Sequence, residues 1–100
     1  MAKKKLSVRK RHMRHVVFRM QEYYGYPLAY AAQREIIAKQ IMNPDFFTYP
    51  VKLTTSRTLH RVVWRDKPFV VMYNNKLKCL ITVLNPKCDD VREHYPDIAT

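Results

Sequence analysis

The spacing of the hydrophobic residues changes near the middle of this chain, and that change limits the folds open to it. Up to about residue 42 the apolar residues recur at helical spacing, and beyond it they cluster in short runs typical of strands. The first helix is expected from about Ser7, a plausible N-cap, to Tyr24, with Gly25, the only glycine, ending it. The segment "YPLAYAAQREIIAKQIM" predicts a second helix, beginning near Pro27 and closed by Asn43.

The second half predicts an antiparallel sheet. "TLHRVVWRD", "PFVVMYN" and "LKCLITVLN" are rich in Val, Ile, Thr and aromatic residues, and short polar segments separate them. The last two runs should form a hairpin through Asn74 and Asn75, and "DFFTYPVKL" would add another strand or an edge segment. The predicted fold class is α+β, with two N-terminal helices packed on one face of a small antiparallel β-sheet.

One hundred residues suffice for a single domain, expected over residues 1–100. Residues 1–6 would be a basic arm, 7–85 the α+β core, and 86–100 a polar C-terminal extension, loosely attached, that holds four of the eight acids. The start is charged with no apolar segment after it, and no apolar run approaches the length of a membrane span. A cytoplasmic protein with two reduced cysteines is therefore expected.

The net charge of +11 is large for so small a domain, and it favours a polyanionic partner. Binding to a membrane surface would need a basic helix with a strongly apolar insertion face, whereas the apolar faces here are better explained as core. Nucleic acid is the favoured partner, and acidic protein surfaces come second.

The first helix carries the candidate chemistry. A core-facing stripe should contain Met13, Val16, Val17, Met20 and Tyr24, and beside it lie His12, His15, Arg19 and Glu22. In one interpretation this stripe, with Arg11 and Arg14, is only a basic surface that contacts solvent or phosphate. In the other, His15 is an acid or base, because its pKa is near working pH, and Arg19 holds a phosphate with its planar guanidinium. His12 is expected to be an ordinary surface histidine.

A metal site is not expected. His12 and His15 could supply two ligands, with Cys79, Cys88, His60 or His94 completing the set, but Arg14 and Arg19 would repel a cation, and no CxxC or HExxH pattern is present.

Strand alternation predicts a second basic surface. One sheet face should carry Arg61, Arg65, Lys78 and Thr82, with Arg57 nearby, whereas His60 should point to the other face with Val62 and Trp64. These cations could hold an RNA backbone or simply face solvent, and His60 could be a buried, hydrogen-bonded residue. Tyr49, Trp64 and Tyr73 could stack on bases, although aromatic residues in strands more often belong to the core.

The segment "HVVFRMQEYYG" resembles the first-helix signature H-x-x-x-R-M-x-E-x-x-G of small toxin-like RNases of the barnase–EndoU–colicin–RelE superfamily. "VVMYNNKLKCLITVL" is similar to the closing hairpin of that group, and the likeness spans about residues 12–84. Basic single-domain members are frequent in bacteriophages.

The resemblance implies metal-independent endoribonuclease activity without a cofactor, in which the 2′-hydroxyl attacks the adjacent phosphate. It implies roles for His15, Arg19, Thr82 and either Arg57 or Arg61, to which His60 is added as a second acid or base. The expected partner is RNA, free or on the ribosome, with an antidote or host protein as a further one. Two alternatives stay open: a non-catalytic RNA- or ribosome-binding protein, and an inhibitor of an acidic host enzyme.

Overall fold

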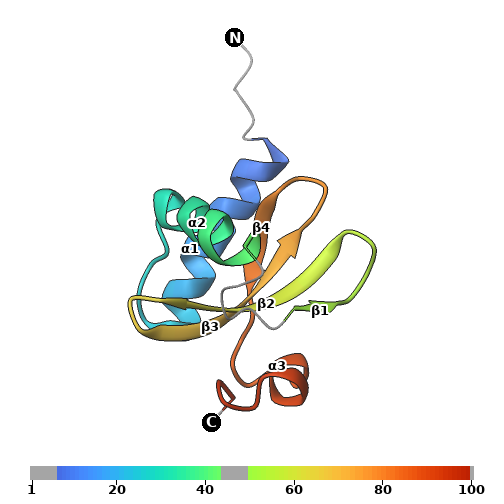
Figure 1. Cartoon of the computed structure of the whole chain (residues 1–100). Coiled ribbons are helices and arrows are strands. Elements are labelled where there is room, and N and C mark those ends of the chain that lie inside the picture. Colours follow the sequence, from blue (N-terminus) through green and yellow to red (C-terminus); the bar gives the residue numbers. More distant parts are fainter. Residues whose placement is uncertain (1–6, 44–49, 100) are drawn as a thin grey trace.

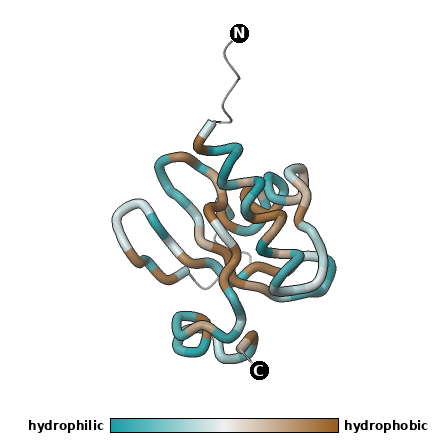
Figure 2. The backbone as a smooth tube through the Cα atoms, turned by 180° about the vertical axis from the view of Figure 1, so that it is seen from behind, coloured by the Kyte–Doolittle hydropathy of each residue, from teal (hydrophilic) through white to brown (hydrophobic). Residues whose placement is uncertain are grey.

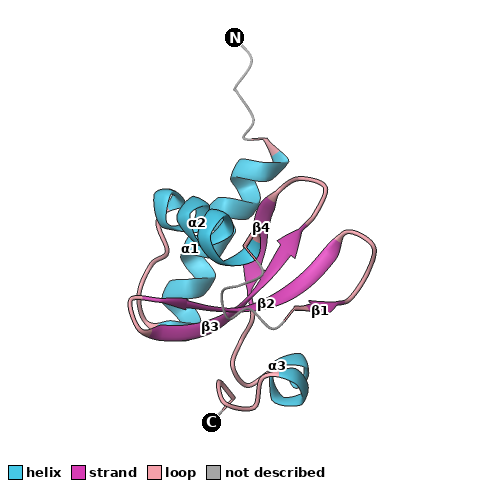
Figure 3. Ribbon diagram, viewed as in Figure 1, coloured by secondary structure: helices cyan, strands magenta, loops and turns pink. Residues whose placement is uncertain are grey.

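A computed structural model describes residues 7–43 and 50–99 of the chain; the predicted basic arm, residues 1–6, lies outside this range (Figure 1). The order of elements is α1 (Val8–Tyr24), α2 (Tyr30–Ile36), a π-helical turn η1 (Ile37–Ile41), β1 (Val51–Lys52), β2 (Arg57–Trp64), β3 (Lys67–Asn74), β4 (Cys79–Val83) and α3 (Asp89–His94) (Figure 3). The predicted α+β class is confirmed, with α1 and α2 on one side of a four-stranded antiparallel sheet.

Both ends of α1 form where the sequence predicts them. The Ser7 side chain accepts a hydrogen bond from the Lys10 amide at 3.2 Å, which satisfies one of the free amides of the first turn. At the other end Gly25 adopts φ +83°, and its amide donates to the Gln21 carbonyl. This left-handed conformation is strained for residues with a Cβ atom, so the only glycine stands where the backbone requires it.

The second helix is shorter than predicted. It begins at Tyr30, because residues 27–29 run outside the helix and carry Leu28 into the core, where it is fully buried. The buried Gln33 amide nitrogen donates to the Met13 and Leu28 carbonyls, both at 2.8 Å, and so ties this connection to α1.

The main core lies between the helices and one face of the sheet. Val16 and Met20 of α1 and Ile36 of α2 pack against Val62 and Phe69, among others, and all five side chains are fully buried. Hydrophobic segments accordingly run along the central strands (Figure 2). Met13 is also buried, so the predicted stripe of α1 does form the core-facing side of the helix.

The sheet has the strand order β1-β2-β3-β4, with every neighbouring pair antiparallel. Arg65 and Asp66 alone connect β2 to β3, at φ +51° and +64°, the conformation of a type I′ hairpin turn. The predicted hairpin between the last two strands is confirmed, and the Asn74 side chain accepts hydrogen bonds from two amides of its turn. Of the segment "DFFTYPVKL", residues 45–49 lie outside the described range, and Val51 and Lys52 form the edge strand β1.

The C-terminal extension is not loosely attached, and that prediction is wrong. Val91 and Tyr95 are buried, together with Ile98, against Leu59 and Val70, on the sheet face opposite α1 and α2. The Tyr95 hydroxyl donates to the Leu59 carbonyl at 3.2 Å. A few apolar residues spaced along a polar segment suffice to cover this face, which would otherwise expose its hydrophobic side chains to water.

The π-helical turn fits α2 to the edge of β2. Gln40 lies in this turn, and its side-chain amide bonds both backbone groups of Val63, donating to the carbonyl at 2.5 Å and accepting from the N–H at 2.9 Å. Both of these groups point away from Pro68, the β3 partner of Val63, and toward the open edge of the sheet. Gln40 therefore closes the part of the β2 edge that lies beyond the two residues of β1. Within the described residues, no helix has the length and apolar character needed to cross a membrane.

Candidate nucleic-acid interface

The N-terminal half of α1 is an exposed basic surface formed by Arg9, Lys10, Arg11 and Arg14. The first turn of the helix contains no acid, and no carboxylate of the described residues forms an ion pair with these four side chains. Cations near a helix N-terminus oppose the helix dipole, whose positive end lies there. This arrangement costs stability in the free chain, and a bound polyanion would relieve it.

A groove of about 570 Å³ lies between this basic surface and β4. Four residues of α1 line one wall, and two residues of β4 line the other: Val8, Arg11, His12, His15, Ile81 and Thr82. In β4, Leu80 pairs with Tyr73 and Thr82 with Met72, so Ile81 is an extra residue without a partner on β3. Such a bulge changes the direction of the side chains around it. The groove thus combines two imidazoles, a guanidinium and a hydroxyl, and none of its described lining residues carries a carboxylate.

His15 and Thr82, both predicted site residues, face the same groove. Partial burial, and then the nearby charges of Arg19 and His12, lower the pKa of His15 below 6.5. A lowered pKa keeps the imidazole neutral at pH 7, the form that accepts a proton. The Thr82 hydroxyl donates to the Val83 carbonyl at 3.3 Å, a long hydrogen bond that a stronger acceptor could replace.

His12, expected to be an ordinary surface histidine, also lines this groove. Its spacing of three residues from His15 was the only signal in the sequence, since residues at i and i+3 are neighbours on a helix surface. That β4 lies opposite both histidines is decided by the packing of α1 on the sheet.

Arg19 does not line the groove. Its guanidinium binds both carboxylate oxygens of Glu22, at 2.7 and 3.0 Å, and lies 5.8 Å from the centre of the Tyr23 ring. The Arg19 side chain is 40% exposed, so the ion pair is accessible to solvent and weak. Both bonds come from the Nη1 atom, and the adjacent Glu22 carboxylate would repel a phosphate that approaches Arg19.

His60 and Arg61 lie away from the groove, on opposite faces of the sheet. His60 pairs with Val71, is 7% exposed, and meets the ring of Tyr73 edge-on at 5.9 Å. Burial lowers the pKa of His60 to about 4, and its Nδ1 atom has no hydrogen-bond partner among the described residues. Arg61 forms an ion pair with Asp97 at 2.7 Å on the face covered by the C-terminal segment. Neither residue meets His15.

The prediction that one sheet face carries a basic surface of Arg61, Arg65, Lys78 and Thr82 is wrong. Arg65 lies in the turn between β2 and β3, and Lys78 lies at φ +55° in the turn between β3 and β4. These turns are at opposite ends of β3, roughly 23 Å apart at 3.3 Å per residue. Arg57, at the start of β2, is exposed and lies at the same end as Lys78.

The strand aromatics belong to the core. Tyr73 is 2% exposed, and Trp64 packs on the core cluster with the Arg65 guanidinium 5.9 Å from its ring centre. Tyr73 therefore presents no free face to a base, Trp64 is partly buried, and Tyr49 lies outside the described residues.

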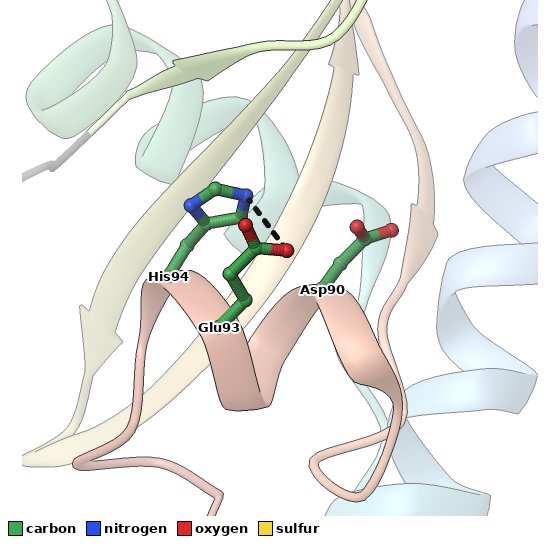
Figure 4. A group of neighbouring side chains, drawn as sticks. All are labelled: Asp90, Glu93 and His94. Carbon is green, nitrogen blue, oxygen red and sulfur yellow. Dashed lines mark ion pairs between the residues drawn. The ribbon is translucent and has the colours of Figure 1, made fainter.

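One group of possible metal ligands occurs among the described residues. Asp90, Glu93 and His94 of α3 bring their ligand atoms within 4.8 Å of one another (Figure 4). His94 and Glu93 lie 3.8 Å apart, and α3 is at the opposite end of the molecule from the N-terminal turns of α1 (Figure 1). Surface acids at this spacing are common without an ion, so the group does not indicate a metal centre, and it is remote from the groove.

Comparison with known proteins found no family model, no curated protein and no solved structure that matches this chain.

Proposed function

We propose that this protein is a metal-independent endoribonuclease that holds RNA on the N-terminal half of α1 and cleaves it in the groove between α1 and β4. The observation that carries the proposal is the groove itself, in which His12, His15, Arg11 and Thr82 meet. These groups lie next to cations that no acid of the described residues neutralises. The sequence resemblance to small toxin-like RNases supports the same activity.

The chemistry requires a base, an acid and a cation. A neutral His15 takes the proton of the 2′-hydroxyl as that oxygen attacks the adjacent phosphorus. The bond from phosphorus to the 5′-oxygen breaks, and His12, as the general acid, gives a proton to that leaving oxygen. Arg11 and the Thr82 hydroxyl stabilise the extra negative charge on the phosphate oxygens. The products are a 2′,3′-cyclic phosphate and a 5′-hydroxyl, and no metal or cofactor is needed.

A second candidate function is RNA binding without cleavage, on the ribosome or on free RNA. Two observations favour it. The Arg19 guanidinium is already bound to Glu22, and His60 and Arg61 do not join His15. Only the chemistry separates this candidate from the nuclease, because both use the same basic surface. With either function, we expect the protein to act in the cytoplasm, as a toxin or host-takeover factor with an antidote or host protein as partner. Inhibition of an acidic host enzyme would use this surface as well.

The test is incubation of purified protein with labelled RNA in EDTA, with and without ribosomes, followed by analysis of the product ends. Cleavage that leaves cyclic phosphate ends is expected, with a loss of at least 100-fold in His12→Ala and in His15→Ala, since general acid–base groups contribute about 10²–10⁴. His94→Ala, on α3, is the matched control. RNA that stays intact under both conditions refutes the nuclease, and undiminished cleavage by both variants refutes the site.

Binding is measured separately from cleavage. The affinity for single-stranded RNA should fall with salt, with a slope that reflects the number of phosphates neutralised. Arg11→Ala and Arg14→Ala should each reduce this slope by about 0.7, whereas Arg92→Ala, on the exposed side of α3, should leave it unchanged. Association that is insensitive to salt would contradict binding through phosphate contacts.

A further inference from the structure

Phe18 is the most exposed large hydrophobic side chain in the described part of the chain. It is 61% exposed, in the middle of α1, a position where a charged residue would face water at no cost. The ring takes no part in either hydrophobic core cluster. Packing of the two core clusters therefore does not require an aromatic residue at this position.

The surroundings of Phe18 are those of the basic surface. The Arg14 guanidinium carbon lies 5.7 Å from the ring centre. Helical spacing also places Phe18 one turn from His15, which lines the groove between α1 and β4; Phe18 itself does not line the groove. A flat apolar ring, a flat guanidinium and an imidazole thus share one short stretch of helix surface.

This combination suits an unpaired nucleobase. Single-stranded RNA is recognised by stacking its bases on aromatic rings and on guanidinium planes, while cations hold its backbone. In a duplex the bases are stacked inside and their faces are not available to a protein ring. Because Phe18 and His15 are one turn apart, a phosphate in the groove leaves the base of a neighbouring nucleotide within reach of Phe18.

We infer that Phe18 is a base-stacking residue, which restricts the substrates of this surface to RNA with an unpaired base beside the bound phosphate. The inference rests on the proposed function and narrows it, because phosphate contacts alone would accept single strands and duplexes alike. Arg14 serves both parts of the site, since its charge attracts the backbone and its plane extends the stack.

The experiment compares three probes by fluorescence anisotropy at one fixed salt concentration: a single-stranded RNA, the duplex of the same sequence, and inorganic polyphosphate, which has charge but no bases. Phe18→Ala should weaken binding of the single strand by about 5- to 150-fold, the equivalent of 1–3 kcal/mol per stacked base, and leave polyphosphate binding unchanged. Phe18→Tyr, which keeps the ring, should restore the affinity. Met42→Ala, another exposed hydrophobic residue, is the matched control.

The outcomes separate this inference from the proposed function. Equal affinity of wild type and Phe18→Ala for the single strand overturns the stacking role while leaving RNA binding intact. A parallel loss for polyphosphate also overturns it, because the effect would then come from charge or from disturbance of α1. If the wild type binds no probe, the proposed function itself fails. Thermal unfolding of each variant confirms that α1 is still folded.

Discussion

Protonation of His60 should destabilise the fold as the pH falls below neutrality. The imidazole is 7% exposed and neutral in the folded chain, where burial lowers its pKa to about 4. In the unfolded chain the ring is solvated, and its pKa is about 6.5. Between these two values the unfolded chain binds a proton that the folded chain does not, so the free energy of unfolding falls as the pH falls.

The size of the effect follows from the two pKa values. One proton changes the free energy of unfolding by 1.36 kcal/mol for each pH unit, which gives about 3 kcal/mol in all from pH 6.5 to 4. About 2 kcal/mol of this is already lost at pH 5. For a domain whose total stability is typically about 5–15 kcal/mol, this loss is large. Below pH 4 both states are protonated and His60 contributes no further change.

Urea unfolding at several pH values between 7 and 4 measures this contribution. His60→Leu removes the titrating group with little change in volume, so the difference between wild type and this variant isolates His60 from the carboxylates, which titrate in both. His94→Ala, which removes an exposed histidine, should follow the wild type. Parallel curves for wild type and His60→Leu would refute the reasoning, since they would mean that the folded chain protonates His60 freely. Cleavage of RNA at pH 7 should survive in His60→Leu, because His60 does not line the groove.

Three further substitutions test the packing. Tyr95→Ala should lower the free energy of unfolding by about 3–5 kcal/mol, as for other large buried rings, and Tm by at least about 12 °C. Arg92→Ala, on the same segment, should change Tm by less than about 4 °C. Equal effects of the two substitutions would mean that the C-terminal segment is loosely attached after all. Gln40→Ala should lower the free energy of unfolding in urea by about 1–3 kcal/mol, because both backbone groups of Val63 lose their side-chain partner. An unchanged urea midpoint would show that water fully replaces the Gln40 amide. Gly25→Ala should lower the free energy of unfolding by about 1–2 kcal/mol through the positive φ alone, since no atom lies within 4 Å of the added Cβ. An unchanged free energy of unfolding would mean that the end of α1 relaxes.

The helix α1 shows which structural features local sequence alone can predict. Its N-cap, its glycine terminus and its buried stripe depend on residues close to one another in the chain, and all three are predictable from capping and periodicity. The start of α2 was less predictable, because the buried position of Leu28 and the contacts of Gln33 hold residues 27–29 outside the helix. The strand pattern also placed His60 and Arg61 on opposite faces, as the register shows.

The candidate site depends on contacts that no local pattern contains. His12 became part of it only because α1 packs across β4 with a bulge at Ile81. Arg65 and Lys78 do not belong to the predicted basic sheet surface, because they lie in turns and not in strands.

The sequence by itself determined the α+β class, the termini of α1 and the excess of positive charge, since short-range periodicity, capping and composition are properties of neighbouring residues. Only the tertiary structure decided which of the charges are available. Arg61 is matched by Asp97, 36 residues further along the chain, and His60 is withdrawn into the interior, whereas the cations at the start of α1 meet no acid among the described residues. Pairing and burial are set by residues distant in sequence, and they distinguish a basic surface that can bind from one that is already neutralised.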